Sequence, residues 1–296
     1  MCEPLKDAMS GIENFKFGTV GSPKTTPKKP GGSIGAIIRL KELGMSALEL
    51  GWVQSVRVSE DTCGQICTTC KDNEFNLSVH APYFINLNAS EEEWPNSKKR
   101  LMDAAYYGNL AGATDIIFHP GSYFMQPAKD VLQRAIPRLR ECVEELRAAG
   151  NPVILRPETM GKAAMLGSLE DTLLMSQAIE GVEPCLDFAH LHARTGDGSM
   201  NTVEEWLQVL DTYSEALGKE SLSRLHIHLS GIEYGEKGER SHLALKESDL
   251  DLQALFIALF DRGCEGRILC ESPEMEEDAL LMKQTWENLA KEKGPR

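Results

Sequence analysis

The sequence repeats one local plan, in which a short apolar run ends on a side chain of the kind that binds metal ions. Residues 77–79 are such a run, and His80 follows them directly, with a proline and two aromatics close behind. The residues in this position, in chain order, are His80, His119, Glu158, Asp187, His228 and Glu271. Because the carboxyl ends of parallel strands meet at one face of a barrel, six such ends predict one shared site.

Helical segments alternate with these strands along the whole chain. The helices expected at residues 90–112 and 202–217 each open on a Ser/Thr-x-x-Glu cap. About eight strand–helix units in a chain of this length are typical of a (β/α)8 barrel. We therefore predict an α/β fold, a single TIM-barrel domain over residues 1–296. Residues 1–15 show no clear period and are expected to form a loose lead-in.

Composition favours a globular protein of a reducing compartment. No apolar run approaches the ~20 residues of a membrane span, and the first residues are too polar for a signal peptide. We therefore expect a cytoplasmic protein that does not enter membranes. The 8 cysteines do not suggest a disulfide framework. Cys185 and Cys270 fall inside predicted strands, where they are expected to be small core residues.

One stretch of the chain is basic, although the net charge is -14. Residues 14–41 contain no acidic residue, five lysines and one arginine, among them Lys24, Lys28 and Lys29. Much of this charge falls in a Pro/Lys/Gly loop at residues 22–32, which a barrel would place at the active face. Two interpretations stay open: a solvated loop, or a patch that contacts nucleic acid.

The histidines and carboxylates together suit metal ions better than they suit separate structural roles. Taken singly, each histidine has an ordinary interpretation as a hydrogen-bonded loop residue, and Asp187 as a helix cap. A mixture of imidazoles and carboxylates is typical of zinc, with manganese or iron as alternatives. The candidate ligands are His80, His119, Glu158, Asp187, His190, His228, His242 and Glu271. This set is too large for one ion, so we expect two or three, with a carboxylate shared between them.

These motifs, taken together and in order, resemble a known enzyme family. They are His80-Ala-Pro-Tyr83, Phe118-His119-Pro-Gly-Ser122, Glu158-Thr, Asp187-x-x-His190, His228-Leu-Ser and Leu269-Cys-Glu271. The set is similar to endonuclease IV, the zinc-dependent apurinic/apyrimidinic endonuclease (AP endonuclease family 2) with a TIM barrel. The resemblance runs from about Phe17 to the last helix, and an insert at residues 231–240 is like that of archaeal-type members.

The resemblance implies a DNA-repair nuclease that acts as a monomer on double-stranded DNA. It would hydrolyse the phosphodiester 5′ to abasic sites through a hydroxide that bridges metal ions. The implied ligand sets are His80, His119 and Glu158 for one zinc; Glu158, Asp187, His228 and Glu271 for a second; and His190 and His242 for a third. Glu158 is thus the bridging, catalytic carboxylate. Tyr83 would lie beside the abasic nucleotide, and Asn86 would support its loop.

One position departs from the family's pattern. The family has Asp-x-His for the third zinc, whereas this chain has Arg240-Ser241-His242. Glu239 or Glu236 would have to supply the missing carboxylate if the loop slides. Otherwise the third ion is weak, and Arg240 would face the DNA phosphate as a fixed cation.

Two other enzyme classes remain as alternatives. Sugar isomerases and epimerases use the same barrel and similar ligands, usually with fewer histidines. The spacing of Cys63, Cys67 and Cys70 resembles the cluster motif of radical S-adenosylmethionine enzymes. Those cysteines, however, fall at i, i+4 and i+7 of a predicted helix, and Thr69 stands where that motif has an aromatic. A non-catalytic binding barrel would not need six ligand-bearing strand ends.

Overall fold

The computed structural model describes residues 14–294, and its central feature is a ring of parallel strands. The strands are β1 Phe15–Val20, β2 Ala47–Gly51, β3 Asn76–His80, β4 Asp115–Phe118, β5 Ile154–Pro157, β6 Cys185–Asp187, β7 Leu225–Leu229 and β10 Gly266–Cys270. They lie in the order β5-β4-β3-β2-β1-β10-β7-β6. Parallel bridges from Leu155 to Val182 and from Glu158 to Cys185 join β5 to β6 and close the ring. The predicted (β/α)8 barrel is confirmed.

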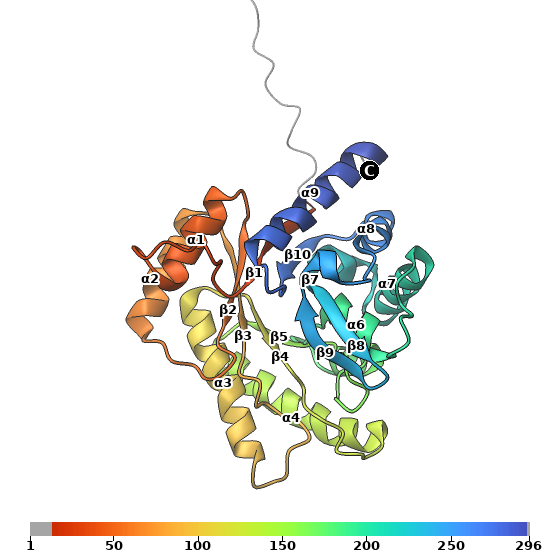
Figure 1. The fold of residues 1–296 in the computed structure, drawn as a ribbon. Helices are drawn as coiled ribbons and strands as arrows, with labels where there is room; N and C mark the ends of the chain where they lie inside the picture. Colours follow the sequence, from red (N-terminus) through yellow and green to blue (C-terminus); the bar gives the residue numbers. More distant parts are fainter. Residues whose placement is uncertain (1–13, 295–296) are drawn as a thin grey trace, which may run out of the picture.

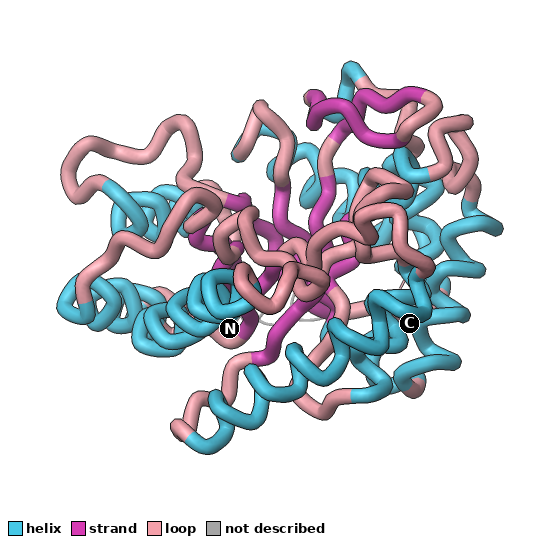
Figure 2. Tube along the Cα trace, turned by 90° about the horizontal axis from the view of Figure 1, so that it is seen from below, coloured by secondary structure: helices cyan, strands magenta, loops and turns pink. Residues whose placement is uncertain are grey.

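Helices surround the barrel on its outside (Figure 1). They are α1 Gly32–Glu42, α2 Glu60–Asp72, α3 Trp94–Ala111, α4 Ala128–Ala148, α5 Leu169–Ala178, α6 Phe188–Arg194, α7 Val203–Leu217, α8 Leu252–Asp261 and α9 Glu276–Lys293. The insert expected at residues 231–240, after β7, forms a two-stranded hairpin of β8 Gly231–Gly235 and β9 Gly238–Leu243. Figure 2 shows the barrel strands in the middle of the molecule and this hairpin at the top of the view. Within residues 14–294, no helix combines the length and apolarity that a bilayer crossing requires.

The strands are apolar because both of their faces are covered. Every residue of β4, β6 and β7 is buried, as expected for parallel strands between a barrel interior and a shell of helices. At Gly18 of β1 a Cβ atom would lie 1.8 Å from the carbonyl oxygen of Ala47, so β1 and β2 can approach here only through glycine. Trp286 of α9 packs edge-on against Phe15 of β1, with ring centroids 4.9 Å apart, and ties the last helix to the first strand.

The sequence located the helices well, but not every helix start. The cap predicted at Thr202 is confirmed as a complete capping box with Glu205 at the start of α7. The cap predicted at Ser90 is wrong, because residues 90–93 form a turn and α3 begins at Trp94 with a proline in its first turn. The predicted lead-in also ends earlier than residue 15: Phe15 already belongs to β1, and residues 1–13 lie outside the described part.

A buried ionic cluster closes the end of the barrel opposite the predicted site. Asp115 at the start of β4 pairs with the guanidinium of Arg156 on β5, and its second oxygen lies 2.8 Å from Arg267 Nη2. Burial opposes ionisation of Asp115, but Arg156 and Arg267 outweigh it and hold the pKa of this carboxyl below its usual value. Its contribution to stability is therefore complete above about pH 4 and is lost as the pH falls further.

Removing one partner of this cluster should destabilise the fold strongly. We predict that Asp115→Asn lowers the free energy of unfolding by about 3–5 kcal/mol at neutral pH, because it removes the buried counter-charge that Arg156 and Arg267 share and leaves Arg156 only its pair with Glu183. Urea unfolding at pH 7 measures the change. The control is Asp103→Asn on α3, which removes an exposed pair with Lys99 and should change stability by less than about 1 kcal/mol. Equal effects of the two substitutions would contradict the argument.

Candidate metal centre

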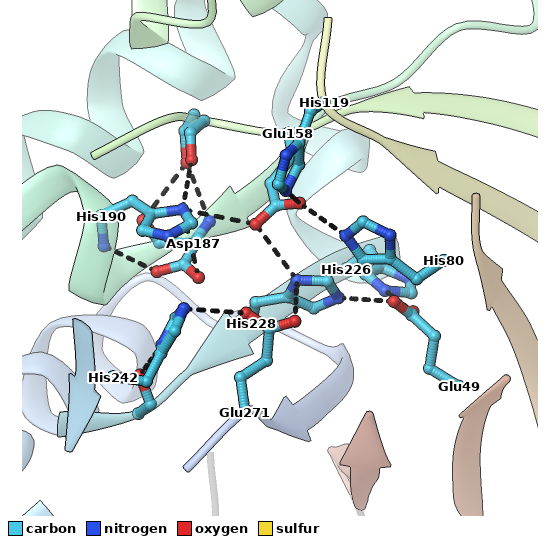
Figure 3. Close-up of polar contacts among 12 residues, drawn as sticks. Glu49, His80, His119, Glu158, Asp187, His190, His226, His228, His242 and Glu271 are labelled. Atoms are coloured by element: carbon cyan, nitrogen blue, oxygen red, sulfur yellow. Dashed lines mark hydrogen bonds and ion pairs between the residues drawn. The ribbon is translucent and has the colours of Figure 1, made fainter. Parts of the chain in front are cut away.

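The strand ends meet as predicted at the carboxyl-terminal face of the barrel (Figure 3). His80 closes β3, Asp187 closes β6 and His228 lies on β7, while His119, Glu158 and Glu271 directly follow β4, β5 and β10. His190 enters from α6 and His242 from β9. All eight of the predicted ligands thus lie in one cluster, although α6 and the hairpin were not expected to supply two of them.

Glu158 lies at the centre of this cluster and is fully buried. Its Oε2 atom is 3.2 Å from His80 Nε2 and 3.4 Å from His119 Nε2. Its Oε1 atom is 3.3 Å from His190 Nδ1 and 3.4 Å from His228 Nδ1. One carboxylate therefore faces imidazoles on both sides, which is the arrangement of a bridging ligand.

The ligand atoms at this face fall into three groups, two of which share a residue, and each group could hold one ion. Within each group the candidate donor atoms lie no more than 4.8 Å apart. The groups are His80, His119 and Glu158; Glu158, Asp187, His228 and Glu271; and His190, Glu239 and His242. Glu158 belongs to two of them, so those two sites would share a carboxylate.

Backbone and hydroxyl groups fix how several imidazoles face this centre. His80 Nδ1 donates to the carbonyl of Ala81 at 2.9 Å, and His190 Nδ1 donates to the carbonyl of Thr159 at 2.9 Å. His242 Nδ1 lies 2.6 Å from the Ser230 hydroxyl. The carbonyls put the proton of His80 and His190 on Nδ1 and leave Nε2 for a metal ion. The Ser230 hydroxyl, which can donate or accept, leaves Nε2 of His242 available in the same way when it accepts from Nδ1.

Asp187 provides the test of whether a cation fits here. Its Oδ1 atom accepts from the backbone N–H of His190 at 2.7 Å and caps α6, as the structural interpretation of this residue supposed. Its Oδ2 atom is buried and has no hydrogen-bond partner among the described residues. It has an ion-pair contact with His190 Nδ1 at 3.4 Å. Because buried carboxylate oxygens normally accept a hydrogen bond, an oxygen left without one beside Glu158, His228 and Glu271 fits a metal ion.

The electrostatics of the cluster lead to the same conclusion. Burial raises the pKa of Asp187 and of Glu271, and the nearby Glu158 carboxylate adds to both shifts. Burial also opposes ionisation of Glu158, but His228 and His119 outweigh it and hold its pKa well below the usual value. Burial lowers the pKa of His190, yet Asp187 and Glu158 raise it to about 10. So many buried acids require positive charge nearby, and divalent cations supply it directly.

Comparison with known proteins identifies the family. The AP endonuclease 2 family model, described as a xylose isomerase-like TIM barrel, matches residues 37–292. The chain belongs to this family. An uncharacterized protein of Methanocaldococcus jannaschii is 36% identical over 274 residues, which cover 92% of this chain and 97% of that protein. Endonuclease 4 of Thermus thermophilus is 29% identical over 216 residues, covering 70% of this chain and 74% of the relative.

Solved structures extend the likeness to the whole barrel. Endonuclease IV from Thermus thermophilus superposes with a TM-score of 0.68 at 22% identity, covering 93% of this chain and 99% of that one. A D-tagatose 3-epimerase-like protein gives the same TM-score at 17% identity and the same coverage. At these identities the structures show the fold alone. The family relatives confirm the endonuclease IV resemblance found in the motifs. Which reaction this chain catalyses has to be argued from the residues of its own site.

In this member of the xylose isomerase-like family, the hairpin brings Glu239, and not Arg240, next to His190 and His242. A register shift in the hairpin pairs Glu233 with Ser241 and Tyr234 with Glu239, so Arg240 is the extra residue of a β-bulge. A bulge puts the strand one residue out of phase, and Glu239 therefore lies on the same face as His242. Glu239 Oε2 is 3.6 Å from His190 Nε2. The loop slide that the sequence left open is this bulge, and Glu236 is not part of the group.

Gly161 makes room for that carboxylate. A Cβ atom on Gly161 would lie 2.7 Å from Glu239 Cβ and 3.0 Å from a ring carbon of His190. The backbone N–H of Glu239 also donates to the carbonyl of Gly161 at 2.9 Å. Only glycine allows the hairpin to approach the barrel this closely.

The cationic side chains predicted to contact DNA differ in whether an acidic residue of the protein already pairs with them. Lys24 Nζ pairs with Glu274 at 2.8 Å, and Glu276 accepts from the backbone N–H groups of Lys24 and Thr25, so this part of the loop is fixed to the start of α9. Lys28 and Lys29 are exposed and form no ion pair with the described residues. Arg240 is exposed and lies 3.4 Å from Glu233, outside the metal groups.

Tyr83 lies at the rim of the site, as the resemblance suggested. Its ring stacks on that of His119 with centroids 4.8 Å apart, and 45% of the residue is exposed. Asn86 supports the loop by accepting from the backbone N–H of Asn88 at 2.9 Å, and it also accepts from that of Ser122 at 3.4 Å. Exposed Phe84 and Phe124 line the same hollow as Tyr83, and exposed Met125 follows Phe124 in the chain.

Sequence reasoning missed Glu49 altogether. It lies on β2, fully buried, where it contacts both His226 and His228. Burial opposes its ionisation, but His228 and His226 hold its pKa below the usual value. The signal was present, because Glu49 stands inside the apolar run Ala47-Leu48-Glu49-Leu50 and a buried strand rarely carries an unpaired acid.

The three-cysteine motif does not form a cluster site. Cys63, Cys67 and Cys70 all lie on α2, and Cys63 and Cys70 face the core. Among residues 14–294 they belong to no group with the geometry of a metal site. The helical interpretation of this spacing is therefore confirmed.

Metal content tests the three groups separately. We predict that Glu239→Gln loses one bound divalent ion per chain relative to the wild type, because the third group loses its only carboxylate. The control is Glu236→Gln, an exposed change in the same hairpin that should leave the content unchanged. Elemental analysis after dialysis in limiting zinc gives the stoichiometry. If the two variants hold equal amounts of metal, the third group is not an ion site.

Proposed function

We propose that this chain is a metal-dependent endonuclease, which hydrolyses the phosphodiester 5′ to abasic sites in double-stranded DNA during DNA repair. The observation that carries the proposal is the shared carboxylate of Glu158, with imidazoles from two metal groups on its two oxygens. Two ions about 3.5–4 Å apart, held by a common carboxylate, are the recurring design for phosphoester hydrolysis. Zinc suits the mixture of imidazole and carboxylate, with manganese as the alternative ion.

The ions would lower the pKa of a water molecule and neutralise a phosphate group in the site. The residues of the chain hold this machinery in position. Glu158 would join two sites, and His80, His119, Asp187, His228 and Glu271 would complete them. The partial exposure of His119, with its side chain 20% accessible, leaves that face of the cluster open to a polymeric substrate.

The surroundings of the cluster also suit DNA. Exposed aromatic and apolar side chains beside a hydrolytic centre can stack on bases or fill the gap that an abasic nucleotide leaves. Phe124 and Met125 are held with φ of 48° and 59°, a left-handed conformation that non-glycine residues adopt only where surrounding structure enforces it. Lys28 and Lys29 add free positive charge on the loop that follows β1.

A sugar isomerase or epimerase is the second candidate, and part of the site favours it. Glu158, Asp187, His228 and Glu271 alone would hold one ion for a polyol, and the solved neighbours include an epimerase-like protein. This function leaves His80, His119 and the Glu239 group without a role. An abasic duplex and a ketohexose, offered to the same preparation, separate the two functions.

The bridging role of Glu158 predicts a large loss of activity on substitution. Glu158→Gln should reduce incision of a duplex carrying one tetrahydrofuran abasic analogue by at least about 1,000-fold, equivalent to ~4 kcal/mol. The assay contains no added magnesium. The control is Glu170→Gln on the exposed side of α5, which should cleave normally. Cleavage by the Glu158 variant at the wild-type rate would refute the shared-carboxylate mechanism.

The basic loop should be visible in the salt dependence of DNA binding. Replacing Lys28 and Lys29 with alanine should reduce the slope of log K against log salt by about 2, since each phosphate contact contributes ~0.9. The matched control replaces exposed Lys71 and Lys219, which lie at the opposite end of the barrel ahead of β3 and β7. An unchanged slope in the Lys28/Lys29 variant would show that the loop does not contact phosphate.

A further inference from the structure

A second polar layer lies inside the barrel, directly beneath the metal cluster. Its centre is Glu49 of β2, and Ser78 of β3 and His226 of β7 surround it. All three residues are buried. Figure 3 shows Glu49 beside His226 and His228, on the side of His228 away from Asp187 and Glu158. None of these three belongs to the ligand set that the family motifs imply.

The Glu49 carboxylate is surrounded by donors. Its Oε2 atom accepts from the Ser78 hydroxyl at 2.7 Å and from His226 Nε2 at 2.9 Å. Its Oε1 atom lies 3.0 Å from His228 Nε2. Both atoms are buried and neither makes a complete hydrogen bond to any described residue, so this charge contact is what stabilises each of them. A buried charge of this kind is tolerated only with such partners.

This contact determines which nitrogen of His228 faces the metal cluster. His228 Nδ1 lies 3.4 Å from both Glu158 Oε1 and Glu271 Oε1. Nδ1 makes a hydrogen bond to Glu158 Oε1. Once an ion takes the place of the proton on Nδ1, the remaining proton would belong on Nε2, where the Glu49 carboxylate can accept it. The other rings differ, because His80 and His190 are oriented through Nδ1 by backbone carbonyls. His228 differs from them in that the carboxylate behind it, Glu49, belongs to none of the candidate metal groups of the described residues.

We propose that Glu49 is a positioning residue of the metal centre: it holds His228 in the Nε2–H tautomer and makes its Nδ1 a stronger ligand for the ion shared with Glu158, Asp187 and Glu271. Carboxylates behind metal-binding imidazoles fix the ring and raise its basicity, and their loss typically costs about 10- to 100-fold in metal affinity or activity. His226 and Ser78 hold the other oxygen of Glu49 and keep the carboxylate from turning away.

This inference rests on the proposed function only in that the cluster binds metal. It does not depend on which substrate the centre cleaves. A competing interpretation concerns Cys185, which forms a candidate donor group with His226 and His228. A thiophilic ion bound there would withdraw His228 from the Glu158 cluster, so the two interpretations exclude each other.

The experiment measures zinc affinity by chelator competition and the visible spectrum of the cobalt-loaded protein, both without DNA. Glu49→Gln should weaken binding of the ion that His228 holds by about 10- to 100-fold and change the cobalt spectrum, while saturating zinc restores the wild-type stoichiometry. The matched control is Ser78→Ala, which removes one hydrogen bond to Glu49 but leaves its contact with His228. That variant should stay within about threefold of the wild type.

Nitrogen-15 NMR spectra of the histidine rings report which ring nitrogen of His228 carries a proton. This signal would not change if Glu49 only stabilised the fold. The zinc-loaded wild type should show His228 with a proton on Nε2 and the ion on Nδ1, and Glu49→Gln should shift the Nε2 signal of this ring. If Glu49→Gln unfolds, His226→Gln is the second variant. It keeps the Glu49–His228 contact and should retain both the tautomer and most of the affinity.

Three results would overturn the inference. They are unchanged zinc affinity and cobalt spectrum in folded Glu49→Gln, an Nδ1–H form of His228 in the zinc-loaded wild type, and loss of one ion per chain in Cys185→Ser. The last result would assign the inner layer to a metal ion instead. A protein that binds zinc in the predicted way but does not incise abasic DNA would refute the proposed function and leave the role of Glu49 intact.

Discussion

The buried carboxylate of Glu158 is the interaction on which the rest of the centre depends. It carries charge in a place with no contact to water, and only the imidazoles on either side make that tolerable. Its two oxygens face different ligand groups, so one side chain sets the relative position of both. The barrel delivers it directly after β5, where the closing bridge to Cys185 fixes the backbone. The position of this one residue in the barrel therefore sets the geometry of both candidate metal groups.

The site is built in layers with separate physical tasks. At one end of the barrel, Asp115 and Arg156 form a closed ionic cluster that contributes stability. In the middle, Glu49 and its donors support His228. At the open end, the ligands face a rim of exposed aromatic and apolar side chains. We expect chemistry at the open end, because there Asp187 keeps a carboxylate oxygen without a hydrogen-bond partner among the described residues and His119 and Glu271 are partly exposed.

Much of this arrangement followed from the sequence. Strand ends that carry His, Asp or Glu predicted the barrel, its active face and the eight ligands that the structure brings together. This worked because the parallel barrel converts order along the chain into proximity at one face. The start of α3 was misplaced because Ser90 caps only a turn, and a local motif does not distinguish a turn from a helix start.

Two features could not be predicted because they depend on contacts between distant segments. The bulge at Arg240 changes which residue of β9 faces the site, and nothing near it in the sequence fixes the register of the hairpin. The role of Glu49 can be recognised only from the folded barrel, in which β2 and β7 bring it into contact with His226 across the interior. An acid inside an apolar strand was a visible signal, but its partner His226 is 177 residues away.

The most direct test of the central claim is anomalous diffraction at the zinc absorption edge from crystals of the zinc-loaded chain. Two peaks on either side of the Glu158 carboxylate, one near His80 and His119 and one near Asp187 and His228, are the predicted result. A single peak that Glu158 does not touch, or a Glu158 side chain paired only with histidines in zinc-saturated crystals, would contradict it.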